Sequence, residues 1–284
     1  MNNTRTVLIT GATGFLGKQA FSALEVAGWS VTQGVRSVSD RSGAQFLHVD
    51  LAQPETILAL KTGYCFDAIV HLGAHIGWSG ASEAEMFVPN VLSTGLLASI
   101  AKDWGAHFVY ASAAIVCGAR KERIDQATEV VPDTDYARSK YLGELLIAAS
   151  HASNCNLRIA GVFGGNGPRH LGLNRAIDEA LKGNAPTQVG SGDALRNYIY
   201  VKDVAQAIVS ALEHKLEGTH LLAGSEVMSI HQMLTALCNV YLPGQSPLAK
   251  VGAVAASQVI QSSSSLPKAR SFHEALVDIQ ETKR

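Results

Sequence analysis

The stretch TVLITGATGFLG, residues 6–17, decides the fold. Its β-branched and aliphatic residues predict a strand that ends at Thr10, and glycines follow at positions 11, 14 and 17. Apolar residues then recur every three or four positions from Leu16 to Ala27, which predicts a helix. Because glycine permits positive φ, and because a helix N-terminus presents unpaired N–H groups, this turn suits an anion. The pyrophosphate of a dinucleotide is the expected anion, and a glycine-rich turn without a ligand is the alternative.

The composition limits the kinds of protein that this chain can be. Of its 284 residues, 47% are hydrophobic and 17% are charged, enough for one large α/β domain or for such a domain with a smaller companion. The formal net charge is −1 and no long basic run is present, so the chain lacks the electrostatic footprint of a nucleic-acid-binding protein. We therefore expect no nucleic-acid partner.

The cysteines and the N-terminal residues bear on the compartment. The four cysteines, at positions 65, 117, 155 and 238, form no CxxC pair, so we expect buried thiols with no disulfide framework and no metal site. The first strand follows MNNTR directly, which leaves no room for a signal peptide, and no apolar run reaches the ~20 residues that span a bilayer. We expect a cytoplasmic protein that binds no membrane.

Strand-like and helical patterns alternate through the first half of the chain. Strands are expected at 30–35, 45–49, 68–72, 107–112 and 157–160, and helices at 54–60, 83–102 and 136–150. Such alternation predicts an α/β fold with a doubly wound parallel sheet. Ligands of such sheets bind beyond the carboxyl ends of the strands.

The second half of the chain is less regular. Residues 161–192 are rich in glycine and turn residues around one predicted helix, 173–181, which is typical of a loop-built cleft. A strand at 198–201 and helices at 203–213, 230–241 and 272–279 are expected after it. Residues 261–270, QSSSSLPKAR, form a polar low-complexity stretch.

The strongest chemical signal is the pair Tyr136 and Lys140, in DYARSK. Residues four apart share one face of a helix, so the ammonium can lie beside the phenol and stabilise its anion. A tyrosine with its ordinary pKa of about 10 is a poor base at neutral pH, and a close cation corrects this. A solvated surface pair is the alternative.

With these residues in place, the chain resembles the extended short-chain dehydrogenase/reductase superfamily, and within it the NAD-dependent epimerase/dehydratase family that acts on nucleotide sugars. The resemblance extends to about residue 240. The motifs that carry it are GATGFLG (11–17), VDL (49–51), HLGAH (71–75), FVPNVLSTG (87–95), YASAAIVCG (110–118), YARSK (136–140), LRIAGVFG (157–164) and RNYIYVKDVAQAI (196–208).

The resemblance implies a role for each matching residue. Those around the cofactor are Gly11, Thr13, Gly14, Phe15, Leu16 and Gly17 at the pyrophosphate, Asp50 and Leu51 at the adenine, Leu72, Gly73, Ala74 and His75 along the bridging phosphates and ribose, and Asn90 as a support. Tyr136 is the implied general acid/base, and Lys140 the residue that holds the nicotinamide ribose and lowers the tyrosine pKa. Asp50 as a cap and His75 as an ordinary loop residue are the alternatives.

The residues after the second strand bear on cofactor choice. NAD-preferring relatives end this strand with an acid that bonds the ribose hydroxyls, but here Val35 is followed by Arg36 and Ser37. A guanidinium attracts the 2′-phosphate that an acid would repel. We therefore expect NADP(H), with NAD(H) possible. A surface arginine that happens to follow a strand is the alternative.

The motif YASAAIVCG departs from the family pattern. The catalytic serine or threonine falls on Ala113, with Ser112 one residue earlier, and Cys117 replaces the usual tyrosine. The missing hydroxyl normally polarises the substrate carbonyl. Ser112 is the candidate replacement, although adjacent strand residues face opposite sides of a sheet.

Substrate contacts are expected in the second half. Arg196 matches the arginine that relatives use on the nucleotide diphosphate, with a salt bridge to Asp193 or Asp203 as the alternative. Asn174 and Arg169 are further candidates, and Ala113 lies at the substrate carbonyl by the same resemblance.

Together these features predict a Rossmann-type NAD(P)-binding domain, residues 1–160 and 196–216, with a small discontinuous substrate domain, 161–195 and 217–284. The expected activity is hydride exchange at a sugar carbon of a nucleotide sugar, as an epimerase/dehydratase-type enzyme or as an NADPH-dependent 4-keto-sugar or other carbonyl reductase. A regulatory protein that binds NADP(H) without turnover is the alternative from another class. Relatives pair the helices at 83–102 and 136–150 into a dimer, so a homodimer is expected.

Overall fold

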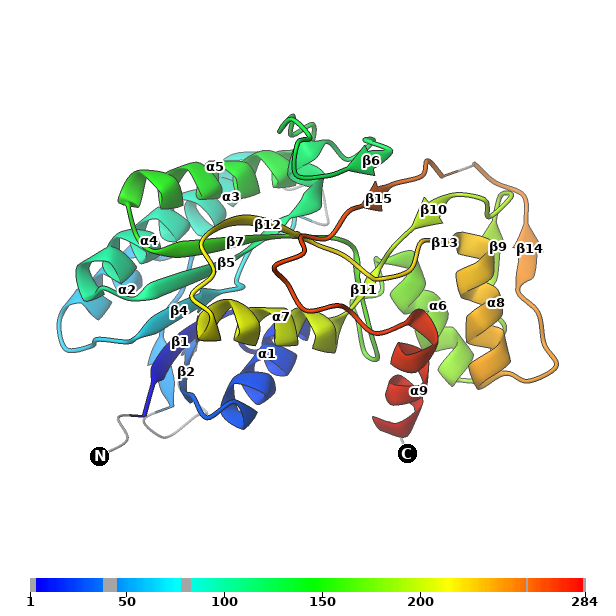
Figure 1. Ribbon diagram of the computed structural model, residues 1–284, viewed down its shortest axis with the longest axis horizontal. Helices are drawn as coiled ribbons and strands as arrows, with labels where there is room; N and C mark the ends of the chain where they lie inside the picture. Colours follow the sequence, from blue (N-terminus) through cyan, green and yellow to red (C-terminus); the bar gives the residue numbers. More distant parts are fainter. Residues whose placement is uncertain (1–3, 38–44, 78–82, 254, 283–284) are drawn as a thin grey trace.

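A parallel sheet forms the centre of the computed structural model, which describes residues 4–37, 45–77, 83–253 and 255–282 (Figure 1). Within these residues the sheet has seven strands in the order β12-β7-β5-β4-β1-β2-β3. They are β1 (Thr6–Thr10), β2 (Ser30–Val35), β3 (Phe46–His48), β4 (Ala68–His71), β5 (His107–Ala113), β7 (Asn154–Ile159) and β12 (Gly218–Leu222). The predicted doubly wound α/β sheet is confirmed.

Helices cover both faces of the sheet (Figure 1). On one face lie α1 (Phe15–Val26) and α7 (Val201–Glu213); on the other lie α2 (Pro54–Leu58) with the short η1 (Ala59–Lys61), α4 (Ser93–Trp104) and α5 (Asp135–Ser150). The central strand β1 serves both cores, because Val7 and Ile9 pack toward α1 and α7 while Leu8 packs toward α4. Strands buried on both faces read as continuous apolar runs, as TVLIT does.

The predicted helix 83–102 is not a single α-helix. It consists of α3 (Glu83–Met86), a π-helical segment η2 (Phe87–Leu92) and α4. Pro89 lies in the π-helical segment and has no N–H to donate to the preceding turn, so the regular α-helical bonding is interrupted there.

The same stretch corrects the expectation on apolar length. Glu83–Trp104 is long and apolar enough, by length and composition, to span a bilayer. Half of its most apolar window is buried, and Leu97, Ala98 and Ile100 pack into the core beside β4 and β5. The core of a globular protein therefore accounts for its apolar character.

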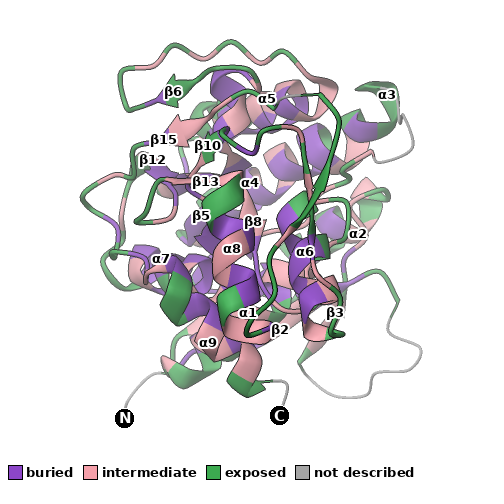
Figure 2. Cartoon of the chain, turned by 90° about the vertical axis from the view of Figure 1, so that its right-hand side faces the viewer, coloured by how far each residue is buried: buried purple, intermediate pink, exposed green. Residues whose placement is uncertain are grey.

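A smaller unit follows at the carboxyl edge of the sheet (Figure 1). It contains α6 (Gly172–Leu181), α8 (Ile230–Tyr241) and α9 (Phe272–Thr282), with the strand pairs β9 (Thr187–Val189) with β14 (Leu248–Lys250) and β10 (Leu195–Arg196) with β13 (Met228–Ser229). Two further pairs link it to the sheet, β8 (Val162–Phe163) with β11 (Ile199–Tyr200) and β6 (Arg123–Ile124) with β15 (Val259–Ile260). Figure 2 shows buried and exposed residues alternating along α6, whose buried side faces this unit's own apolar core.

One strand of the main sheet, β12, is absent from the sequence prediction, as are the short strands of the small two-stranded pairs other than β11. Residues 217–284 were assigned to the smaller domain, whereas β12 pairs with β7 in the main sheet. As an edge strand with Thr219 and His220 partly exposed, it lacks the apolar run of a central strand. The domain boundaries otherwise stay a prediction.

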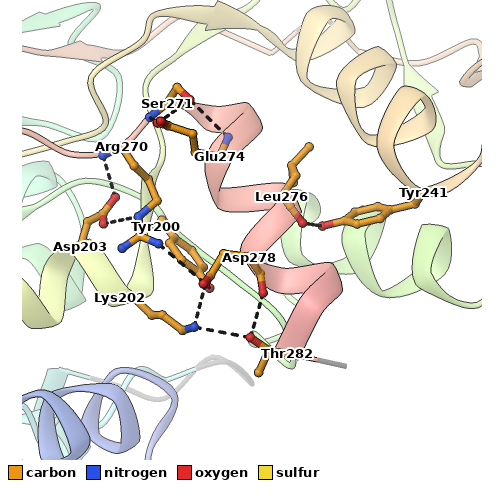
Figure 3. A network of polar contacts seen from close by, with 10 residues as sticks. All are labelled: Tyr200, Lys202, Asp203, Tyr241, Arg270, Ser271, Glu274, Leu276, Asp278 and Thr282. Carbon is orange, nitrogen blue, oxygen red and sulfur yellow. Dashed lines mark hydrogen bonds and ion pairs between the residues drawn. The ribbon is translucent and has the colours of Figure 1, made fainter. Parts of the chain in front are cut away.

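Ion pairs attach the C-terminal helix α9 to α7 (Figure 3). The Arg270 Nε lies 2.7 Å from Asp203 Oδ1, and Lys202 Nζ lies 2.7 Å from Asp278 Oδ2. The Tyr200 hydroxyl also donates to Asp278, at 2.5 Å. Burial and the nearby Asp278 carboxylate raise the pKa of this hydroxyl far above its usual range. The last helix is therefore joined to the sheet-covering layer.

Candidate active site

The glycine turn between β1 and α1 is close-packed on one side and open on the other. Gly11 has φ +71°, and a Cβ there would lie 2.7 Å from the Gly73 nitrogen in the loop after β4. A Cβ on Gly17 would overlap the Gly11 carbonyl oxygen. Gly14 is exposed and would meet only that same oxygen, at 3.2 Å. Close packing therefore excludes a side chain at Gly11 and at Gly17, whereas the outer face of the turn at Gly14 is open.

The start of α1 fits the pyrophosphate of a dinucleotide. No side chain caps the helix at Gly14, and its first turn carries no acidic residue. No described group accepts from the N–H groups of Phe15, Leu16 or Gly17. Three unpaired donors beside an exposed glycine form the kind of site that binds phosphate. Thr13 lies exposed on the same turn.

Asn90 joins the loop after β4 to the helix that carries Tyr136. The His75 N–H donates to Asn90 Oδ1 at 2.7 Å, and Asn90 Nδ2 donates to the His75 carbonyl at 2.8 Å. The same Nδ2 donates to Ser139 Oγ at 3.0 Å, and Ser139 donates to the Tyr136 carbonyl at 2.8 Å. Asn90 thus contacts the His75 backbone and the Ser139 hydroxyl. Ser139 was missed, although its place in YARSK, one turn after Tyr136, could have indicated it.

Tyr136 and Lys140 lie on α5, which begins after the N-cap Thr134. Lys140 is only 2% exposed, and its Nζ lies 4.2 Å from the centroid of the Tyr110 ring. Burial lowers the pKa of Lys140 to about 7, against the opposing effect of the Glu144 carboxylate. A cation over an aromatic face gains some of the stabilisation that water would supply.

The expected effect of Lys140 on the pKa of Tyr136 stays a prediction. Burial raises the pKa of Tyr136 to about 12. The Lys140 ammonium lies over the Tyr110 ring, and the Tyr136 hydroxyl bonds to no residue that the structure describes. Tyr136 is thus a protonated phenol at neutral pH.

Ser112 does not supply the hydroxyl missing at Ala113. Its Oγ donates to Glu144 Oε1 at 2.5 Å, inside a buried cluster. Arg158 holds the same carboxylate with two bonds, Nε–Oε1 at 3.0 Å and Nη2–Oε2 at 2.7 Å. Because the single hydroxyl proton is used there, Ser112 has a structural role. Ala113 ends β5 partly exposed, with a methyl group at the position where the sequence resemblance implies a hydroxyl.

The residues expected at the adenine and at the bridging phosphates gather beside the glycine turn. A Cβ on Gly73 would lie 2.7 Å from Leu51 Cδ1, so these two loops touch. The Leu72 N–H donates to the Thr10 carbonyl at 3.2 Å. Asp50 Oδ1 accepts from the Ala52 N–H at 3.0 Å, which is the capping alternative, and Ala74 and His75 lie partly or fully exposed.

Comparison with known proteins decides the family. The model of the NAD dependent epimerase/dehydratase family matches residues 7–224. The chain belongs to this family. It is 23% identical to CDP-abequose synthase of Salmonella typhimurium over 256 residues, which cover 87% of this chain and 85% of that protein. It is 26% identical to methionine adenosyltransferase 2 subunit beta of Rattus norvegicus over 249 residues, 84% and 72% of the two chains.

A solved structure agrees on the fold. UDP-N-acetylglucosamine 4-epimerase from Bacillus cereus superposes with a TM-score of 0.84 at 22% identity, over 99% of both chains. This epimerase/dehydratase chain therefore has the fold of nucleotide-sugar epimerases, and an NAD(P) cofactor is typical of its family.

Arg36 and Arg196 are the two arginines expected to contact the cofactor and the substrate, and they differ in their contacts within this family member. Arg36 is exposed and makes no ion pair with a described residue; the residues from 38 to 44 lie outside the description. Arg196 donates through Nη1 to the carbonyls of Leu195 and Ala256 and has no described carboxylate partner. The alternative salt bridge with Asp203 is not formed, because Asp203 pairs with Arg270.

Asn174 and Arg169, the other two residues expected to contact the substrate, bond to other residues of the protein. Asn174 is buried, accepts from the Gly164 N–H at 3.0 Å and donates to the Val162 carbonyl at 3.3 Å. Arg169 pairs with Asp178 and Glu179 at 2.6 and 2.8 Å. Asn174 therefore shapes the glycine-rich loop from within.

A cavity of about 620 Å³ lies outside this site, between β6, β15 and the chain from 261 to 269. None of the predicted site residues lines it. Three of the four cysteines are buried as expected, whereas Cys65 is exposed.

Proposed function

We propose that this chain is an NAD(P)-dependent oxidoreductase that exchanges a hydride with a sugar carbon of a nucleotide sugar, with Tyr136 as acid/base. The observation that carries the proposal is the Asn90 bridge. It holds the loop after β4, beside the glycine turn, against the α5 turn from Tyr136 to Lys140. A dinucleotide-binding turn and a proton-transfer pair thus belong to one bonded unit.

The residues of the chain have distinct tasks in this proposal. The bound nicotinamide supplies or accepts the hydride. Tyr136, protonated because burial raises its pKa to about 12, is ready to donate its proton to a carbonyl oxygen. Lys140 lies one turn away on α5, where its ammonium can stabilise the phenolate that remains. In the opposite direction the phenolate takes up the proton of a sugar hydroxyl.

The cofactor proposal is NADP(H) in preference to NAD(H). Arg36 supports it, because the guanidinium is exposed directly after β2 and unpaired among the described residues. A fork of free donors at this position matches a 2′-phosphate. Net reduction by NADPH is the outcome that Arg36 favours, whereas epimerisation returns the hydride to the other face of the sugar.

The substrate proposal is a nucleotide diphosphate sugar. Arg196 supports it, because Nη1 is held by two backbone carbonyls while no described carboxylate neutralises the charge. Backbone carbonyls orient a guanidinium and leave its positive charge available to a diphosphate. The names of two similar proteins, CDP-abequose synthase and UDP-N-acetylglucosamine 4-epimerase, each contain a nucleotide diphosphate sugar.

The test is a turnover assay with purified protein. With NADPH and a panel of nucleotide 4-keto sugars, a reductase removes the absorbance of the reduced nicotinamide. An epimerase interconverts UDP-sugars without that loss. Tyr136→Phe abolishes either activity because the hydroxyl is removed, and it leaves cofactor binding within about twofold because the aromatic ring is kept. A Tyr136→Phe protein with wild-type turnover would refute the assignment.

A second candidate is a regulatory protein that binds NADP(H) without turnover. Ala113 favours it, because no hydroxyl is available at the end of β5 to polarise a carbonyl. The similarity to a methionine adenosyltransferase subunit agrees with this alternative. Tight cofactor binding without conversion of any sugar in the same panel would favour it. The cytoplasmic location stays a proposal for both candidates.

A further inference from the structure

A chain of buried hydrogen bonds runs beneath the candidate site. Thr10, the last residue of β1, lies with its Oγ1 2.6 Å from His71 Nδ1 at the end of β4. The other ring nitrogen, Nε2, lies 2.9 Å from Thr94 Oγ1 on α4. Thr94 Oγ1 donates in turn to the Asn90 carbonyl at 2.7 Å. Thr10, His71 and Thr94 are each at most 1% exposed, so water does not compete for these bonds.

The bonding pattern fixes the tautomer of His71. Thr94 has one hydroxyl proton, and a carbonyl oxygen can only accept it, so the Thr94 oxygen must accept from His71 Nε2–H. Nδ1 then carries no proton and accepts from the Thr10 hydroxyl. Burial lowers the pKa of His71 to about 3, so the ring stays neutral at any pH at which the protein works.

The His71 ring also has aromatic contacts. It stacks on Tyr110 with ring centroids 5.5 Å apart and planes at 23°. The Lys140 ammonium lies over the same Tyr110 ring. The ionisable groups around His71 are therefore Tyr110 from β5 and Lys140 from α5, and the Lys140 charge further disfavours a protonated ring.

This series of hydrogen bonds ends at the part of the helix that departs from α geometry. Asn90, whose carbonyl Thr94 binds, lies in the π-helical segment η2. A π segment shifts the backbone bonding by one residue, and a hydroxyl that bonds a carbonyl within it helps to hold that geometry. The amide of the same Asn90 holds His75 and Ser139. The orientation of the Asn90 side chain therefore depends on the helical turn that the Thr94 hydrogen bond stabilises.

We propose that His71 and Thr94 are positioning residues, which keep the glycine turn and the π-helical segment in register so that Asn90 holds the loop after β4 against α5. This inference rests on the proposed function for its effect on turnover. Its effect on the backbone does not, because the His75 N–H bond to Asn90 is formed between residues of the chain itself. Neither residue needs to touch the cofactor or the sugar.

The test compares Thr94→Val, which keeps the shape but removes the hydroxyl, with Thr94→Ser, which keeps the hydroxyl. In the cofactor-free protein, Thr94→Val is expected to speed amide hydrogen exchange at His75 about tenfold, the effect of losing roughly one buried hydrogen bond. Thr94→Ser restores exchange to within about twofold. With a substrate of the wild type, Thr94→Val lowers kcat about tenfold with KM changed less than twofold.

A matched control separates this effect from a general loss of stability. Ser93 is the neighbouring buried residue on α4, and its hydroxyl donates to the Leu51 carbonyl at 2.6 Å, outside the chain from Thr10 to Asn90. Ser93→Ala removes a comparable bond and is expected to leave exchange at His75 unchanged. Faster exchange at His75 in Ser93→Ala as well would reduce the Thr94 effect to destabilisation and overturn the proposal.

Two further measurements keep the proposal testable if Thr94→Val does not fold. Thr10→Val and Thr10→Ser repeat the comparison from the β1 end of the chain, with the same expected contrast at His75. Long-range ¹H–¹⁵N correlation in the wild type is expected to show His71 protonated on Nε2 alone. A proton on Nδ1, or wild-type exchange in the valine variants, contradicts the inference. If the wild type shows no turnover, the proposed function is refuted. The hydrogen-exchange experiments then decide the positioning role of His71 and Thr94 by themselves.

Discussion

Replacing Lys140 by Met is expected to make the cofactor-free protein more stable at low pH and to remove a pH dependence. The folded chain lowers the pKa of Lys140 from 10.5 to about 7, because the side chain is buried with no described hydrogen-bond acceptor for Nζ. At about 1.36 kcal/mol per pKa unit, this lowering corresponds to a penalty of about 5 kcal/mol on the charged form. Methionine fills similar space without a charge.

The sign of the pH dependence follows from proton counting. Below pH 7 the folded and the unfolded chain both hold the lysine proton, so the full penalty is present and does not vary with pH. Between about pH 7 and 10.5 only the unfolded chain holds it, so wild-type stability rises with pH by up to about 1.4 kcal/mol per pH unit. Lys140→Met lacks this rise.

Urea unfolding from pH 6 to pH 9, without cofactor, measures the difference. The stability advantage of Lys140→Met over the wild type is expected to shrink by about 3 kcal/mol across this range, while the effects of other groups cancel in the comparison. Lys102→Met, at an exposed lysine of α4, is the control and should give a constant difference. A constant difference for Lys140→Met as well would show that Lys140 is not forced toward its neutral form.

Four further predictions concern the proposed activity and assembly. Ala113→Ser restores a hydroxyl at the end of β5 and is expected to raise kcat by about 10- to 100-fold, as steady-state assays with the active sugar would show; unchanged kcat would mean that the chain does not need this group. Arg36→Ala is expected to weaken NADP(H) by about tenfold or more in titration calorimetry and NAD(H) by less than twofold, and equal weakening of both would count against a 2′-phosphate contact. Arg196→Ala is expected to raise KM for a nucleotide sugar by roughly 10- to 100-fold with cofactor affinity unchanged, whereas a kcat effect alone would remove the diphosphate role. Leu146→Glu, on an α5 side chain that is 38% exposed, is expected to convert a dimer to monomer in sedimentation velocity, and a wild type that is already monomeric would contradict the proposed pairing of helices.

The parts of the site that follow from short stretches of sequence could be predicted. The glycine turn and its helix come from one run of twelve residues, and their backbone geometry is set by neighbours in the chain. The shared face of Tyr136 and Lys140 follows from helix periodicity alone. The interruption near Asn90 was also within reach, because Pro89 lies inside the predicted helix.

The parts that depend on contacts between distant segments could not be predicted. The Ser112 hydroxyl is bound to Glu144, which Arg158 also holds, and these two partners come from two other elements. The pKa of Lys140 depends on its burial over the ring of Tyr110, thirty residues earlier on β5. Local patterns contain neither the burial nor the partner, so the direction of both effects is set only by the folded chain.

The position of β12 in the sheet has a consequence for synthesis on the ribosome. This strand covers the outer side of β7 but comes about sixty residues later, after the helix α7. Until it emerges, the nascent chain exposes the N–H and C=O groups of β7 as an open edge that can recruit other chains. A pause in translation before residue 218 would therefore expose the protein to aggregation at a stage when the glycine turn after β1 has already been synthesised.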